Sequence, residues 1–209
     1  MERYRVYPGQ GALVVYVVDS WEHPLDLEAG LGGVGAAVVQ IVDARWNQDL
    51  SPWVVPGLPG GAPFTGGAEA YLQGLIGQTI PRIEAQAGLG GRERAVAGYS
   101  LVGLFALYAL TRTAFFSMAA SVSGSLWYEG WLDYLAGAGV DARYVYLSLG
   151  KREKCARSPR LAQVEACTQR TLALLQAKGI SAQLHMHPGG HFCDPAARMA
   201  AACAALARA

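Results

Sequence analysis

Short runs of apolar residues recur along the chain, and their composition predicts strands. Residues 13–19, LVVYVVD, form an almost continuous apolar run rich in β-branched side chains. A strand buried on both faces of a parallel sheet has this composition. Similar runs occupy residues 36–42, 94–99, 116–122, 144–149 and 182–187.

The segments between these runs show the spacing of amphipathic helices. Residues 67–86 predict one helix, and Pro81 is expected to kink it or to end its first part. Residues 159–178 predict a long amphipathic helix that Gly179 closes as a C-cap. A last helix is expected to begin at Asp194, with the acid as N-cap and Pro195 in the first turn.

Strands that alternate with helices predict an α/β fold: an open, mostly parallel sheet with right-handed crossovers and helices on both faces. The functional loops of such a sheet gather at the carboxyl ends of its strands. Residues 43–67 are rich in Gly, Pro and Trp, and an irregular loop of this length is often functional. The chain has no internal repeat or linker, so residues 1–209 are predicted to form a single domain without a large lid.

Composition narrows the class of protein. The chain has 209 residues, 52% of them hydrophobic and 16% charged, which suits a buried sheet covered by helices. A net charge of +1 argues against a nucleic-acid partner. Without a signal-peptide segment or an apolar stretch long enough to span a membrane, we expect a soluble, cytoplasmic protein. The four cysteines lack C-x-x-C spacing and are expected to be free thiols. The oligomeric state stays open, with a homodimer as one option.

The segment GYSLVGLFALYAL, residues 98–110, predicts a sharp turn from a strand into an apolar helix, with Ser100 in the turn. This is the geometry of a nucleophile elbow, whose pattern is G-x-S-x-G. Gly98 and Ser100 fit the pattern, but Val102 stands where the second glycine is expected, and Gly103 follows it. Two alternatives are open: Gly103 relieves the crowding, or the valine distorts the elbow and weakens catalysis.

A serine nucleophile needs a histidine base that is oriented by an acid. His191 lies in the glycine-rich segment HPGGHF, between the last predicted strand and the last predicted helix. The acid should follow an earlier strand, and Glu153 stands three residues beyond Gly150, at the carboxyl end of the predicted strand 144–149. We therefore predict Ser100, Glu153 and His191 as the catalytic residues. A solvated role of Glu153 in its charged turn is the alternative.

Further candidates surround these residues. For the oxyanion hole we expect the N–H of Leu101 and a second N–H from Ser20 or Trp21, which follow the first predicted strand. Trp46, Trp53 and Trp127 are expected to shape the substrate pocket, with packing in the core as the alternative for each. His185, His187 and His191 have a spacing that a metal could use, but no carboxylate lies close to them in sequence. No metal or cofactor is predicted.

Several of these segments together resemble one family. GYSLVGLFALYAL, SVSGSLWY (121–128), YLSLGKREK (146–154) and HPGGHF are similar to the elbow, a serine-rich turn, the acid loop and the histidine loop of α/β-hydrolase fold serine esterases of the "putative esterase" family. That family includes esterase D, siderophore esterases and the antigen 85 mycolyltransferases. DLSPW, residues 49–53, resembles a loop motif of the siderophore-esterase-like branch.

The resemblance implies Ser100 as nucleophile, His191 as general base and Glu153 as the orienting acid, in agreement with their positions along the chain. The expected activity is hydrolysis of a small-molecule carboxylic ester through an acyl-enzyme on Ser100. Two alternatives remain: a degenerate, non-catalytic hydrolase fold that binds a small molecule or a partner, and an acyltransferase.

Overall fold

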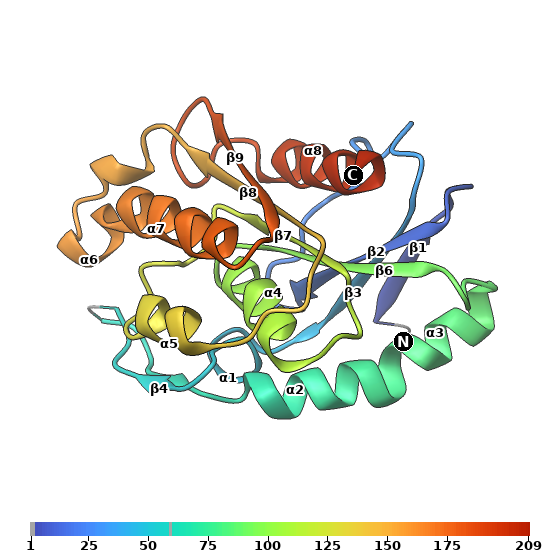
Figure 1. The fold of residues 1–209 in the computed structure, drawn as a ribbon, viewed down its shortest axis with the longest axis horizontal. Coiled ribbons are helices and arrows are strands. Elements are labelled where there is room, and N and C mark those ends of the chain that lie inside the picture. Colours follow the sequence, from blue (N-terminus) through green and yellow to red (C-terminus); the bar gives the residue numbers. More distant parts are fainter. Residues whose placement is uncertain (1–2, 59) are drawn as a thin grey trace.

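A seven-stranded sheet forms the centre of the molecule (Figure 1). The computed structural model describes residues 3–58 and 60–209. The strand order is β1-β3-β2-β6-β7-β8-β9, and every neighbouring pair is parallel except β1 and β3. This arrangement confirms the predicted α/β fold. The strands of the sheet are β1 (Tyr4–Tyr7), β2 (Leu13–Ser20), β3 (Ala37–Ala44), β6 (Glu93–Tyr99), β7 (Met118–Val122), β8 (Tyr144–Gly150) and β9 (Ser181–His187).

All six apolar runs are strands, but three short strands were not predicted. β1 is an edge strand with the alternating sequence YRVY, and only its pairing with β3 fixes it. β4 (Val54–Val55) and β5 (Phe64–Thr65) form a small antiparallel hairpin inside the segment expected to be irregular. Two-residue strands carry too little pattern to be recognised from sequence.

The helices agree with the spacing of apolar residues, with local differences. The segment predicted as one helix consists of α2 (Ala68–Gly74), the π turn η1 (Leu75–Thr79) and α3 (Ile80–Ala87). Pro81 cannot donate a backbone hydrogen bond, and the helix passes through the π turn directly before it. The other helices are α1 (Trp46–Asp49), α4 (Leu101–Arg112), α5 (Trp131–Gly137), η2 (Glu153–Cys155), α6 (Pro159–Ala162), α7 (Val164–Ala177) and α8 (Pro195–Arg208).

Two helix-end predictions need comment. The helix expected over 159–178 is divided into α6 and α7 at Gln163, and Gly179 follows it with a φ of 81°, as a glycine beyond a helix end commonly does. Asp194 holds the N-cap position before Pro195, as predicted, but it does not cap the helix through its side chain. Its backbone is left-handed, with a φ of 49°, and its side chain makes no capping hydrogen bond.

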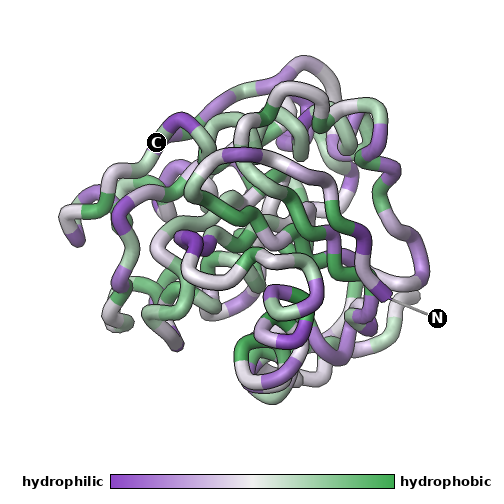
Figure 2. The backbone as a smooth tube through the Cα atoms, turned by 90° about the vertical axis from the view of Figure 1, so that its right-hand side faces the viewer, coloured by the Kyte–Doolittle hydropathy of each residue, from purple (hydrophilic) through white to green (hydrophobic). Residues whose placement is uncertain are grey.

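The two faces of the sheet carry separate apolar clusters. The larger cluster packs α2, α3, α4, α5 and α7 against one face, and residues 101–110 of α4 are all buried in it. The smaller cluster packs Met199, Cys203 and Leu206 of α8 against the other face. Figure 2 shows the same layering, with hydrophobic strands inside and hydrophilic segments outside.

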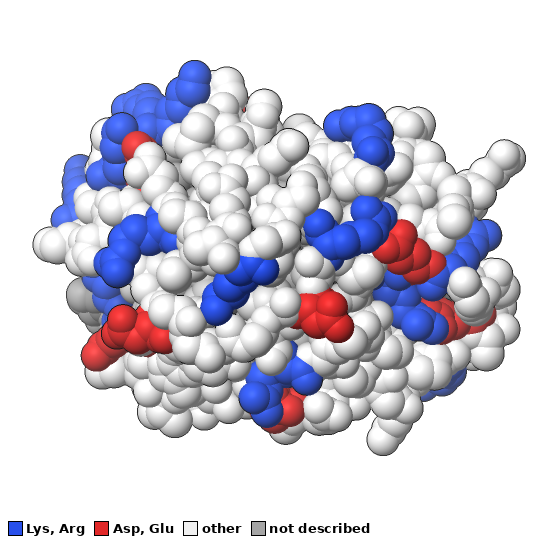
Figure 3. All heavy atoms as spheres, viewed as in Figure 1, with Lys and Arg blue, Asp and Glu red and all other residues white. Residues whose placement is uncertain are grey.

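The surface shows no single dominant charge. Figure 3 shows acidic and basic side chains interspersed over much of one face, with basic side chains gathered at the upper left, near the end of the molecule where α6 lies. Within residues 3–58 and 60–209, no helix has the length and apolar character needed to cross a membrane.

Candidate active site

Ser100 lies in the sharp turn between β6 and α4 that the sequence predicts. Its φ of 57° and ψ of −118° are unusual for a residue with a side chain, so the surrounding structure must hold it there. The Ser100 N–H donates to the carbonyl of Val122 at 2.9 Å, and its carbonyl accepts from the N–H of Ser125 at 2.9 Å and of Gly103 at 3.0 Å. These backbone hydrogen bonds fix the turn and leave the Ser100 hydroxyl outside the backbone hydrogen-bonding pattern.

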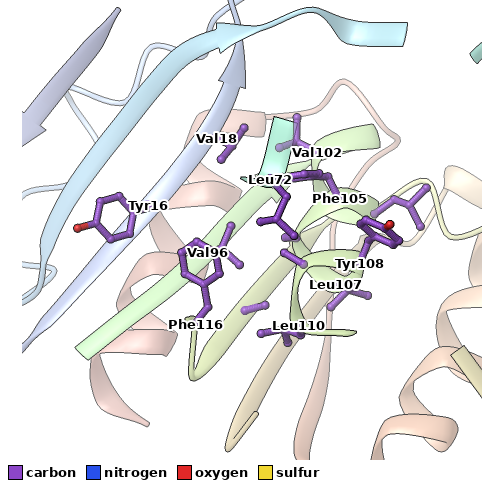
Figure 4. Packing of buried hydrophobic residues seen from close by; sticks show 14 of the residues in the cluster. Tyr16, Val18, Leu72, Val96, Val102, Phe105, Leu107, Tyr108, Leu110 and Phe116 are labelled. Atoms are coloured by element: carbon purple, nitrogen blue, oxygen red, sulfur yellow. The ribbon is translucent and has the colours of Figure 1, made fainter. Parts of the chain in front are cut away.

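The elbow accommodates Val102 because Gly98 has no side chain. A Cβ atom at Gly98 would lie 2.4 Å from the Val102 Cγ1 atom, far inside van der Waals contact. Gly103 instead lies against β7 and the turn that follows it: a Cβ there would lie 2.8 Å from the Ser121 hydroxyl and 3.0 Å from the Gly124 Cα atom. Val102 is 2% exposed and belongs to the larger apolar cluster, which Figure 4 shows together with Phe105. The valine is therefore a packed part of the turn.

Restoring the usual glycine pattern with Val102→Gly is expected to destabilise the protein. The change removes a buried side chain and places glycine in a helix, so the free energy of unfolding should fall by about 2–3 kcal/mol. Urea denaturation measures this change. Val54→Gly is the matched control, because Val54 is 71% exposed and its replacement should cost about 1 kcal/mol at most. An unchanged or increased stability of Val102→Gly would contradict the packing role.

The structure brings Ser100, His191 and Glu153 together. The His191 Nε2 atom lies 3.0 Å from the Ser100 hydroxyl oxygen, and its Nδ1 atom lies 2.8 Å from the Glu153 Oε2 atom. The loops after β8 and β9 are joined by two backbone hydrogen bonds, from the N–H of Lys151 to His187 and from the N–H of Arg152 to Gly189. This pairing of the loops explains why the acid and the histidine meet.

The other carboxylate oxygen of Glu153, Oε1, accepts hydrogen bonds from three residues. Oε1 accepts from the Gly150 N–H at 2.7 Å, from the Ser123 hydroxyl at 2.7 Å and from Arg198 Nη1 at 3.2 Å. Burial by itself raises the pKa of the Glu153 carboxyl, but the hydrogen bonds from His191, Ser123 and Gly150 outweigh it and lower the pKa. The carboxylate is therefore ionised at neutral pH, as an acid that orients a histidine must be.

Three polar residues around these groups were missed by the sequence analysis. Ser123 and Arg198 bind Glu153, and the Tyr99 hydroxyl donates to the carbonyl of His191. The position of Arg198 in the sequence could have indicated its role. It lies on the stripe of α8 that also carries Met199, Ala202, Cys203 and Leu206, and these are all buried. A charged residue on an apolar stripe indicates a buried polar contact.

The predicted oxyanion donors differ in their present contacts. The Leu101 N–H, at the start of α4, has no acceptor among the described residues. The Ser20 N–H donates to the Asp19 carboxylate at 2.9 Å, and the Trp21 N–H donates to the carbonyl of Ala44 at 3.3 Å.

The tryptophans predicted to line the pocket make packing contacts. Trp53 packs against Tyr128 and Tyr134 and donates from its indole N–H to the carbonyl of Glu129 at 2.9 Å. Trp127 contacts Phe64 and the Arg160 guanidinium, and Trp46 is partly buried against the larger cluster. These contacts agree with packing in the core, which the sequence leaves open as the alternative for each of these tryptophans. By contrast, Trp21 is 55% exposed, and Phe192, next to His191, is 90% exposed.

The histidines considered for a metal are divided between two places. His185 and His187 lie side by side, with ring centroids 4.6 Å apart, whereas both ring nitrogens of His191 face Glu153 and Ser100. In the described part of the chain, no group of three or more His, Cys, Asp or Glu side chains is arranged to hold a metal ion. The four cysteines are free thiols.

Several solved structures with a similar fold are named as hydrolases or esterases. An IroE-like serine hydrolase from Shewanella oneidensis matches with a TM-score of 0.77 at 19% identity, over 98% of this chain and 75% of that chain. Siderophore hydrolase EstA from Aspergillus nidulans matches with a TM-score of 0.70 at 20% identity, over 96% and 84%. The enterobactin esterase Fes from Shigella flexneri matches with a TM-score of 0.72 at 18% identity, over 98% of this chain and 55% of that chain.

At these identities the likeness shows the α/β-hydrolase fold. The presence of siderophore esterases among the neighbours agrees with the branch that the DLSPW motif suggests. No curated protein matches the chain in sequence. A family model does match, over residues 2–195, and its description is "Putative esterase". Since this match spans nearly the whole chain, the protein belongs to that family and is a carboxylic ester hydrolase.

Proposed function

We propose that this esterase cleaves its substrate through an acyl-enzyme on Ser100, with His191 as general base and Glu153 as the acid that orients it. The observation that carries the proposal is the unbroken chain of contacts from the Ser100 hydroxyl to His191 Nε2, at 3.0 Å, and from His191 Nδ1 to Glu153, at 2.8 Å. In the first step Ser100 attacks the ester carbonyl while His191 accepts its proton. His191 then returns the proton to the leaving alcohol, and water releases the acid.

The negative charge that develops on the carbonyl oxygen needs two N–H donors. The Leu101 N–H supports this role because it is unused among the described residues and lies at the N-terminus of α4. For the second donor we favour the Trp21 N–H over that of Ser20. The bond of Trp21 to Ala44 is long, at 3.3 Å, whereas Ser20 is held at 2.9 Å by an acid buried in the fold.

A fluorophosphonate probe tests the assignment of Ser100 as the nucleophile. We expect the probe to label the folded protein once, on the peptide that contains Ser100, because only a serine activated by a base reacts at a useful rate. Mass spectrometry of the digested protein locates the label. Ser181→Ala is the control, since Ser181 is exposed on β9 and its loss should leave labelling unchanged. A folded protein that stays unlabelled would contradict the assignment of Ser100.

The substrate is best sought among small esters. Two of the reported structural neighbours are named for siderophores or enterobactin, so a panel of siderophore lactones, short acyl esters and thioesters covers the relevant chemistry. The ratio of acid to transferred acyl product in the presence of added alcohol separates hydrolysis from acyl transfer.

A further inference from the structure

Arg198 is a buried cation that the proposed mechanism leaves without a role. It lies in the first turn of α8, and its side chain is among the most buried polar groups of the protein, at 2% exposure. Moving a guanidinium out of water is costly unless acceptors surround it. All of the acceptors that Arg198 has are beside the candidate active site.

The two arms of the guanidinium reach different parts of that site. Nη1 donates to the Ser123 hydroxyl at 3.0 Å and to Glu153 Oε1 at 3.2 Å. Nη2 donates to the carbonyls of Pro188 at 2.8 Å and Gly190 at 2.9 Å, in the loop that carries His191. One planar group therefore binds both the acid and the backbone of the histidine loop, which a single lysine ammonium cannot reproduce with the same geometry.

Two neighbouring residues are adapted to this arrangement. Gly150 leaves the space that the guanidinium fills, since a Cβ there would lie 2.9 Å from Nη2 and 3.0 Å from Nη1. Tyr99, which directly precedes Ser100, has its hydroxyl 3.5 Å from Nη1 and donates to the carbonyl of His191. Arg198 thus contacts residues at or just beyond the carboxyl ends of β6, β7, β8 and β9.

We propose that Arg198 is a positioning residue of this esterase. It holds Glu153 by Oε1 so that Oε2 stays free for His191, and it fixes the loop that places His191 against Ser100. The inference rests on the proposed roles of Ser100, His191 and Glu153.

Arg198→Met and Arg198→Lys separate geometry from charge. Misplacement of the histidine loop should lower kcat about 100-fold in Arg198→Met, with little change in KM, because Arg198 lies behind the pair and away from the substrate. In Arg198→Lys, the charge remains but the planar guanidinium is lost, so kcat should fall about 10-fold, again with little change in KM. Steady-state kinetics with a p-nitrophenyl ester give these values.

Arg208→Met is the matched control, because Arg208 is an exposed arginine in the last turn of the same helix and should change neither value. A purely structural role predicts a lower melting temperature with wild-type kcat and KM in the folded fraction, and this result would overturn the inference. If Arg198→Met does not fold, a wild-type kcat in Arg198→Lys overturns it equally.

Ser100→Ala, measured beside these variants, separates this inference from the function on which it rests. An inactive Ser100→Ala with a fully active Arg198→Met refutes the role of Arg198 alone. An active Ser100→Ala refutes both.

Discussion

Replacing Ser100 by alanine is expected to reduce ester turnover about 10⁶-fold. The hydroxyl is the group that forms the acyl-enzyme, and nothing nearby is placed to replace it. The hydroxyl oxygen of Ser125 lies 3.4 Å from that of Ser100, but in the described part of the chain Ser125 makes no hydrogen bond to His191. Water activated directly by His191 would leave only a small residual rate.

The folded structure should survive the change. The turn is fixed by the backbone bonds of Ser100 to Val122, Ser125 and Gly103, none of which uses the hydroxyl. We therefore expect circular dichroism and the melting temperature of Ser100→Ala to match the wild type closely, while hydrolysis of a p-nitrophenyl ester disappears. Ser181→Ala serves again as the control for the same substitution at an exposed site. A rate for Ser100→Ala within tenfold of the wild type would remove Ser100 from the mechanism.

The sequence was sufficient to predict the elbow and its two partner loops because each depends on local pattern. Gly98 and the apolar run after Ser100 determine a strand-to-helix turn. In a parallel sheet, the loops after β8 and β9 necessarily emerge at the same edge as this turn. The parallel direction of the predicted strands thus indicated that Glu153, His191 and Ser100 lie at the same edge of the sheet.

Features that depend on tertiary contacts were beyond the sequence. Arg198 is 45 residues from Glu153 along the chain, and no motif links the two. Whether a tryptophan lines a pocket or packs inside depends on its neighbours, and Trp53 is held by Tyr128 and Glu129, far along the chain. The availability of the Ser20 N–H was likewise not predictable, because it depends on the rotamer of the adjacent Asp19.

Glu153→Gln is expected to lower kcat about 10⁴-fold, and the reason lies in the surroundings of Oε1. Gly150, Ser123 and Arg198 all donate hydrogen bonds to that position, so the amide oxygen of the glutamine must occupy it. The NH₂ group then faces His191 Nδ1. Because an NH₂ group can only donate, Nδ1 must become the acceptor and the proton moves to Nε2. In that tautomer, Nε2 cannot accept the proton of Ser100.

A Glu-to-Gln change at a second position separates the tautomer effect from a simple loss of negative charge near the site. Glu165→Gln is the control, since Glu165 pairs with Lys154, the neighbour of Glu153 in η2, and should keep wild-type kinetics.

The lowered pKa of Glu153 means that its ionised form stabilises the fold at neutral pH, and that this contribution disappears as the pH falls through the folded-state value. Unfolding measured against pH should therefore show a steeper loss of stability toward acid in the wild type than in Glu153→Gln. A decrease in kcat below threefold would exclude Glu153 as the orienting acid, because a tautomer that cannot accept the Ser100 proton is incompatible with so small an effect.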